Sequence, residues 1–145
     1  MIKDVISIDE DASVKDAANL MTQHEIGSLV VTKQRKPVGI ITERDLLSRV
    51  IATGKYAEAT TVNAIMSKPL ICGNPEMNAD DAARYMVNKK IKKLPVVEDE
   101  RLIGIMTLTD LCTVQPDLAK VIEEETRGKI PKRFIKRLSK NYFHT

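Results

Sequence analysis

Two short segments carry side chains suited to binding a ligand, Thr42-Glu43-Arg44-Asp45 and Thr107-Leu108-Thr109-Asp110. Each follows a glycine and two apolar residues. A Thr and an Asp three positions apart form a capping box, in which both side chains bind free N–H groups at a helix start. Capping alone accounts for either segment. A carboxylate beside a helix start is also a good acceptor for the two hydroxyls of a ribose, and the helix start itself favours phosphate.

The two segments belong to a duplicated stretch of sequence. When the chain is shifted by 65 positions, residues 11–47 align without a gap on residues 76–112, and 12 of the 37 pairs are identical. Such regular self-similarity is the mark of a repeated supersecondary unit. A unit of about 60 residues buries little surface by itself, so we expect the two copies to share one core.

Each copy predicts a strand, a helix, two strands and a short helix. The apolar spacing and the turn residues place these elements at 5–8, from 14, 28–32, 38–41 and 46–50 in the first copy, and at 70–72, from 79, 94–97 and 102–106 in the second. A short helix over 61–66 links the copies, and another runs from Pro116 to about Thr126. The predicted fold is α+β, with two pseudo-symmetric β-α-β-β-α repeats (1–60 and 61–115) packed together through their sheets and a helical extension (116–145).

The doubled Gly-h-h-Thr-x-x-Asp motif, in which h is an apolar residue, occurs together with Leu94-Pro95-Val96-Val97 before its second copy. In this combination residues 1–115 resemble a tandem pair of cystathionine-β-synthase (CBS) domains, as in stand-alone regulatory CBS proteins. Such pairs bind adenosine-containing ligands, such as AMP, ADP, ATP or S-adenosylmethionine, in clefts between the two halves. They regulate other functions, catalyse nothing themselves and commonly associate. The resemblance implies an adenosyl effector, no required cofactor, a homodimer and a separate effector protein as a candidate partner.

The resemblance also assigns roles to individual side chains. These are Asp45 and Asp110 for the ribose hydroxyls; Thr42, Arg44, Thr107 and Thr109 for the phosphates; Ile6 and Ile26 for an adenine held with Asp110; Ile71 and Ile91 for an adenine held with Asp45; and Lys92 and Lys93 for further phosphate contacts. Gly27 and Ser28 replace the two lysines in the first copy, so we expect the two clefts to differ in anion affinity. Isoleucines are more often plain core, and the charges at 43 and 44 could tie Asp45 into a surface ion pair.

Charge divides the chain into two parts. Residues 1–126 carry 16 Lys and Arg against 20 Asp and Glu, a net charge of −4, whereas residues 127–145 carry seven cations and no acid. Phe134, Leu138 and Tyr142 recur at helical spacing there, which predicts a basic amphipathic helix over 132–143. This segment supports an alternative function, binding of nucleic acid or of a protein partner. We favour a helix that packs its apolar stripe, because few aromatic residues are available for base stacking.

Other classes of function find no support in the sequence. His24 and His144 are isolated, so no zinc-ligand spacing occurs, and no nucleophile–base pair suggests an enzyme. Cys72 and Cys112 lie among apolar residues, and we expect both to be buried free thiols. No apolar run is long enough for a membrane span and no signal peptide is evident, so the prediction is a cytoplasmic protein.

Overall fold

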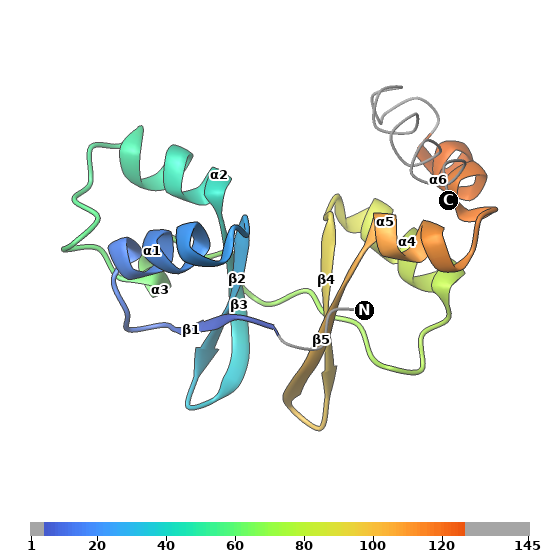
Figure 1. Ribbon diagram of the computed structural model, residues 1–145, viewed down its shortest axis with the longest axis horizontal. Helices are drawn as coiled ribbons and strands as arrows, with labels where there is room; N and C mark the ends of the chain where they lie inside the picture. The colour runs from blue at the N-terminus through green and yellow to red at the C-terminus, as the bar shows by residue number, and fades with distance from the viewer. Residues whose placement is uncertain (1–4, 127–145) are drawn as a thin grey trace. The chain divides into compact units, whose positions relative to one another are not determined.

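The computed structural model describes residues 5–126, apart from the side chains of Val114, Val121 and residues 124–126. Residues 1–4 and 127–145 lie outside the described part, and so does the helix predicted over 132–143. The described chain divides into two compact units, one of residues 5–71 with 97–103 and one of residues 72–96 with 104–126 (Figure 1). The first unit contains the helices up to residue 65, including the helix that links the two copies, and the second unit contains the helices from residue 79 onward.

The first copy follows the predicted order of elements. These are β1 (Ser7–Asp9), α1 (Val14–His24), β2 (Ser28–Lys33), β3 (Lys36–Thr42), α2 (Glu43–Leu46), the π-helical turn η1 (Leu47–Ile51) and α3 (Val62–Ile65). β1 pairs in parallel with β2, and β2 pairs antiparallel with β3. The strand predicted over 5–8 begins two residues later and ends one residue later. The helix predicted to continue through 46–50 does so as a π-helical turn.

Local side-chain chemistry sets both ends of α1. The Ser13 hydroxyl accepts a hydrogen bond from the N–H of Asp16 at 3.1 Å, which satisfies one free donor of the first turn. At the other end Glu25 adopts the left-handed conformation, with φ 53°, and its N–H bonds back to the last turn. The apolar residues that recur at helical spacing are Val14, Ala17, Ala18 and Met21. Val14, Ala17 and Met21 are at most 4% exposed, and Ala18 is half-buried. The three buried residues pack in a core that also contains Ile8, Leu29, Val31, Ile41, Val50, Val62, Ile65 and Met66.

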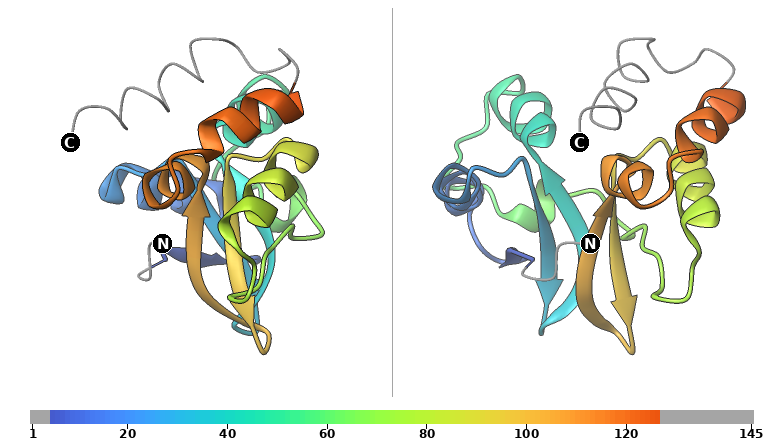
Figure 2. Two further views of the ribbon diagram at one scale, coloured as in Figure 1. Left: turned by 90° about the vertical axis from the view of Figure 1, so that its right-hand side faces the viewer. Right: turned by 45° about the vertical axis from the view of Figure 1, so that its right-hand side comes forward.

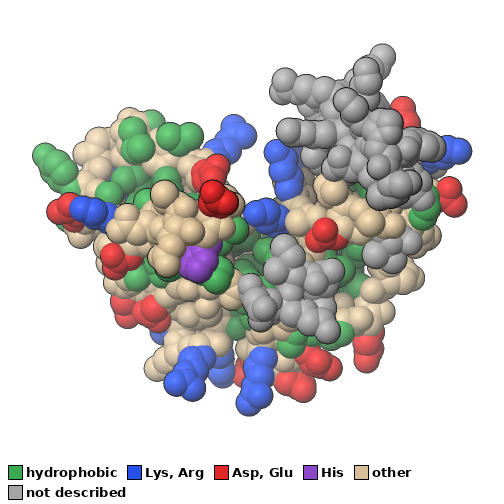
Figure 3. All heavy atoms as spheres, viewed as in Figure 1, with side chains coloured by type: hydrophobic (Ala, Val, Ile, Leu, Met, Phe, Trp, Pro, Cys, Tyr) green, Lys and Arg blue, Asp and Glu red, His purple; other side chains and the backbone are tan. Residues whose placement is uncertain are grey.

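The two hairpins turn more tightly than the sequence predicts. Polar residues at 33–37 suggested a five-residue turn, but only Gln34 and Arg35 leave the strands, with φ of 50° and 67°. Asp99 and Glu100 adopt the same positive φ in the second hairpin. Two consecutive residues with positive φ give the twist that a two-residue hairpin needs. Charged side chains gather at these tips, along the lower edge of the molecule in Figure 3.

The second copy consists of α4 (Ala79–Lys89), β4 (Lys93–Glu98), β5 (Arg101–Thr107), α5 (Leu108–Val114) and the additional helix α6 (Leu118–Thr126). The strand predicted over 70–72 is wrong. In the described part of this copy, the segment before α4 makes one isolated parallel bridge, between Gly73 and Val96. Pro75 follows two residues later and has no N–H to donate, so the pairing does not extend.

Helix α6 forms part of the core of the second unit. It was predicted to start at Pro116 and begins two residues later, and it lies beside α4 (Figure 2). Its apolar face is fully buried, with Leu118 0% and Ile122 1% exposed. The cysteines differ from the prediction: both are free, but Cys112 is buried and Cys72 is exposed.

Candidate functional site

The first Thr-x-x-Asp segment forms a complete capping box at the junction of β3 and α2. The N–H of Asp45 donates to the Thr42 hydroxyl at 3.2 Å. In return, Oδ2 of Asp45 accepts from the Thr42 N–H at 2.9 Å and from the Thr42 hydroxyl at 3.0 Å. The capping interpretation of this segment is therefore confirmed, and one oxygen of the carboxylate has both of its lone pairs engaged.

The second segment repeats this arrangement between β5 and α5, with fewer bonds to the carboxylate. The N–H of Asp110 donates to the Thr107 hydroxyl at 3.0 Å, and Oδ2 of Asp110 accepts from the Thr107 N–H at 3.3 Å. Among the described residues this is the one hydrogen bond that the Asp110 carboxylate accepts. Asp110 is half-buried, so its carboxylate keeps most of its capacity to bind a further donor.

Asp45 has a charged partner that sequence reasoning missed. Its Oδ1 lies 3.7 Å from Nε of Arg49, one helical turn further along, and its side chain is only 12% exposed. Nη1 of the same guanidinium donates to the carbonyls of Ile65 at 2.8 Å and Met66 at 3.3 Å. The surface ion pair suggested through residues 43 and 44 is thus replaced by a partly buried one. The i, i+4 spacing of Asp45 and Arg49 was the signal that could have found it.

The motif glycine of the first copy, Gly39, lies against the segment that follows α3. A side-chain carbon at Gly39 would lie 2.8 Å from the carbonyl oxygen of Ser67 and 2.8 Å from the sulfur of Met66. Ser67 pairs with Ile40 through two backbone hydrogen bonds, of 3.1 and 2.9 Å. The close approach that a glycine permits therefore serves the packing of the segment after α3 against β3.

The residues before β2 and β4 differ sharply in charge between the copies. Lys90, Lys92 and Lys93 occupy the positions that Glu25, Gly27 and Ser28 hold in the first copy. Both Glu25 and Lys90 end their helices in the left-handed conformation, so the backbones match while the charges do not. The two copies therefore have the same backbone conformation at the end of this helix but side chains of different charge.

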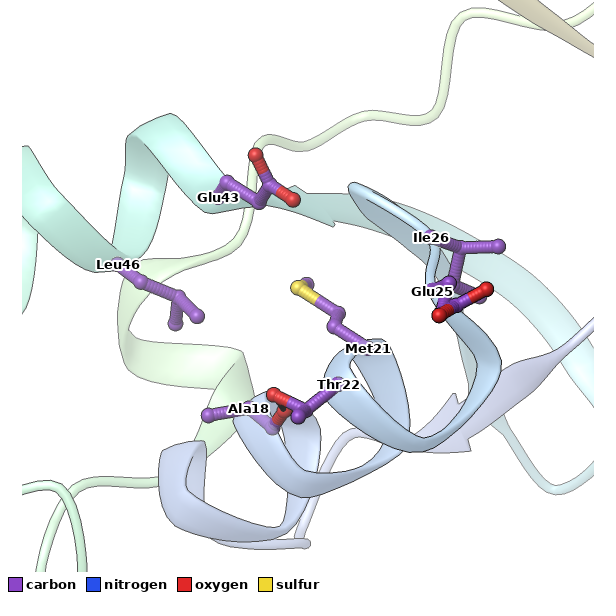
Figure 4. Close-up of a pocket in the computed structure, with 7 residues that line it drawn as sticks. All are labelled: Ala18, Met21, Thr22, Glu25, Ile26, Glu43 and Leu46. Carbon is purple, nitrogen blue, oxygen red and sulfur yellow. Dashed lines mark hydrogen bonds between the residues drawn. The ribbon is translucent and has the colours of Figure 1, made fainter.

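A pocket of about 390 Å³ opens beside the first capping box (Figure 4). Its lining residues come from α1, from the segment before β2 and from α2: Ala18, Met21, Thr22, Glu25, Ile26, Glu43 and Leu46. Met21 and Leu46 point into it, and the carboxylates of Glu25 and Glu43 add two negative charges to its wall. A side-chain carbon at Gly27 would lie 3.2 Å from Cδ of Glu43, so this carboxylate rests against the start of β2. Sequence reasoning did not single out this pocket.

The remaining predicted site residues have varied surroundings. Ile6 and Ile26 are half-buried and pack against the core of the first unit, which fits the plain-core reading. Ile71 and Ile91 are half-buried as well, while Arg44 and Thr109 are exposed. The adenine sites pair isoleucines of one copy with the aspartate of the other. Those pairings, and all of the ligand contacts, stay predictions.

Few titratable groups among the described residues are perturbed. Burial raises the pKa of the Cys112 thiol. A hydrogen bond and opposite charge at 2.9 Å raise the pKa of Lys15 and lower that of Glu58, on the exposed surface. Within residues 5–126, no three His, Cys, Asp or Glu side chains are grouped so that they could hold a metal ion. None of the helices described there has the length and hydropathy to cross a bilayer.

Comparison with known proteins extends these observations. The family model of the CBS domain matches residues 1–52 and again 62–117. An uncharacterized protein of Methanopyrus kandleri is 39% identical over 86% of this chain, which spans 65% of that protein. The CBS domain-containing protein YhcV of Bacillus subtilis is 36% identical over 79% of this chain and 81% of its own length.

Enzymes that contain similar sequence match only in part. An inosine-5'-monophosphate dehydrogenase of Methanocaldococcus jannaschii is 38% identical over 77% of this chain, yet the match covers 22% of the enzyme. Among solved structures, a putative signal-transduction protein with CBS domains from Burkholderia ambifaria superposes with a TM-score of 0.72 at 29% identity, over 79% of this chain and 85% of that one. The similarity thus lies in the duplicated unit and covers a minor part of the enzyme.

Proposed function

This chain belongs to the CBS domain family, and on that premise we propose that it is a regulatory module that binds an adenosine-containing ligand. CBS pairs are commonly regulatory ligand-binding modules, and stand-alone CBS proteins are not enzymes. The ligand class we propose is AMP, ADP, ATP or a related adenosyl compound. Its ribose hydroxyls donate hydrogen bonds to a motif carboxylate.

The observation that carries the proposal is the state of the Asp110 carboxylate. It is half-buried in the first turn of α5, it is held in place by the Thr107 N–H, and among the described residues it accepts no second hydrogen bond. An ionised carboxylate has room for about four hydrogen bonds, so a diol can add two without displacing the cap. Such bonds to a charged acceptor are stronger than neutral ones.

Two lysines at the start of β4 support a phosphorylated ligand. Lys92 and Lys93 lie at the start of β4, in the same unit as Asp110. The resemblance assigns them to phosphate contacts, and they bring two positive charges to the second unit. A nucleotide gains attraction there that a nucleoside does not, and this gain weakens as salt screens the charges.

The regulatory output follows from differential affinity. A ligand changes the arrangement or association of a protein only if it binds one state better than another. We propose that the output is a change in contacts with a second copy or with a separate protein. A related protein, the CBS-CP12 protein of bloom-forming cyanobacteria, is hexameric, which shows that such chains associate.

Thermal unfolding with a panel of ligands tests the proposal. A ligand that binds only the folded protein at one hundred times its Kd stabilises it by about 2.7 kcal/mol and raises the midpoint. We expect AMP or ATP to raise the midpoint of the wild type and not that of Asp110→Ala. Guanosine and cytidine nucleotides are the matched ligand controls. If only RNA or DNA shifts the midpoint, and deletion of residues 127–145 abolishes the shift, nucleic-acid binding replaces this proposal.

A further inference from the structure

The two motif aspartates have different partners, although they occupy equivalent positions in the repeat. We infer that the carboxylate of Asp45 is committed to the fold by Arg49, so that the chain binds one adenosyl ligand, at Asp110. This inference rests on the proposed function and specifies which motif performs it. It makes Arg49 the residue that decides the number of ligands.

The acceptor capacity of Asp45 is largely used. Both lone pairs of Oδ2 face donors of Thr42, at 2.9 and 3.0 Å, and Oδ1 faces Nε of Arg49 at 3.7 Å. Only 12% of the Asp45 side chain is exposed. A ribose would have to displace the guanidinium before both of its hydroxyls could reach this carboxylate.

The guanidinium of Arg49 is itself held in place. Nη1 donates to the carbonyls of Ile65 and Met66 at 2.8 and 3.3 Å, at the end of α3. Displacing Arg49 would therefore break its contacts with Asp45 and leave these partly buried carbonyls without their donor. An exposed i, i+4 ion pair adds little to stability. Arg49 contacts both the Asp45 carboxylate and the two carbonyls, so its position is fixed more firmly than that of such a pair.

The second copy has no arginine at the equivalent position. The position that corresponds to Arg49 is Val114, the last residue of α5, which cannot form an ion pair. Asp110 accepts one bond, of 3.3 Å, from within the described residues. The motif carboxylate is thus occupied by protein donors in the first copy and available to a ligand in the second.

Nearby charges add to the difference between the copies. Glu25 and Glu43 line the pocket beside Asp45, and the Glu43 carboxylate rests against the start of β2. The residue that corresponds to Glu43 in the second copy is Leu108, which is buried and uncharged. Within the motif itself, the Glu43 carboxylate therefore adds a negative charge beside the first copy that the second copy lacks, and this charge repels phosphates.

Exchanging the residues that follow the motif tests the inference. Isothermal titration calorimetry of the full chain with ATP is expected to give one site per chain. Arg49→Val removes the guanidinium that faces Oδ1 of Asp45 and leaves only the Thr42 contacts, so we expect a second site. Adenosine is the probe for that site, because it carries no phosphate for Glu25 and Glu43 to repel. Arg49→Lys keeps the positive charge and is the matched control, with one site expected.

The reciprocal variant places an arginine four residues after Asp110. Val114→Arg is expected to raise the Kd for ATP at least threefold, whereas Val114→Leu, which adds no charge, leaves it unchanged within about twofold. Circular dichroism shows whether each variant is folded. If Arg49→Val does not fold, the Kd of Val114→Arg for ATP still tests the inference. Two sites in the wild type, or wild-type affinity in Val114→Arg, would overturn the inference. Failure of the wild type to bind any adenosine compound would instead remove the proposed function, and this inference with it.

Discussion

Replacing each motif aspartate by alanine in the ligand-free protein separates a structural carboxylate from an available one. Asp45→Ala removes two hydrogen bonds to a charged acceptor, and such bonds are worth about 1.5–3 kcal/mol each before non-additivity is considered. It also removes the partner of Arg49, a pair whose arginine is 48% exposed and which adds at most about 1 kcal/mol. We therefore expect a loss of about 3 kcal/mol in the free energy of unfolding.

Asp110→Ala is the matched variant in the other copy. It removes one bond of 3.3 Å at a half-buried position, for which we expect a loss of about 1 kcal/mol. In both variants the threonine hydroxyl still caps the backbone N–H of the residue that replaces the aspartate, so the capping bond that remains is the same.

Urea unfolding followed by circular dichroism measures the difference. At equal m-values, the midpoint of Asp45→Ala should fall clearly below that of Asp110→Ala, by an amount that corresponds to about 2 kcal/mol. Equal losses, or a larger loss for Asp110→Ala, would refute the reasoning that Arg49 and Thr42 commit Asp45 to the fold.

Two further predictions concern packing and thiol chemistry. Gly39→Ala places a carbon 2.8 Å from the carbonyl oxygen of Ser67 and should lower stability by about 1–3 kcal/mol in urea unfolding; Gly54→Ala, at φ 71° with no atom within 4 Å, should cost about 1 kcal/mol through backbone strain alone. Ellman's reagent at pH 8 should react quickly with one thiol per chain, and Cys72→Ser should remove that phase. Burial raises the pKa of the Cys112 thiol, so its contribution to the free energy of unfolding is complete below the ordinary pKa of 9.0 and declines as the pH rises above that value. Rapid labelling of Cys112 in the folded protein, or a free energy of unfolding that rises above pH 9, would contradict this prediction.

The sequence determined the elements whose signals are local. The caps at Ser13 and Thr42, the apolar stripe of α1 and the strands of both hairpins follow from residues within a few positions of one another. The duplication placed the second copy by analogy with the first. This analogy failed at residues 70–72, because the segment makes a single bridge at Gly73 and Pro75 has no N–H with which to extend it.

Only the tertiary structure decided which motif carboxylate is committed. Thr42-x-x-Asp45 and Thr107-x-x-Asp110 are identical as patterns, yet the contacts that distinguish them depend on the end of α3 reaching Arg49 from 16 residues further along the chain. The same holds for the neighbour of Gly39 and for the exposure of Cys72. Local patterns specify how a backbone begins and ends its helices, because the atoms involved are adjacent in the chain. The partners of a side chain depend on which distant segments the fold brings to it.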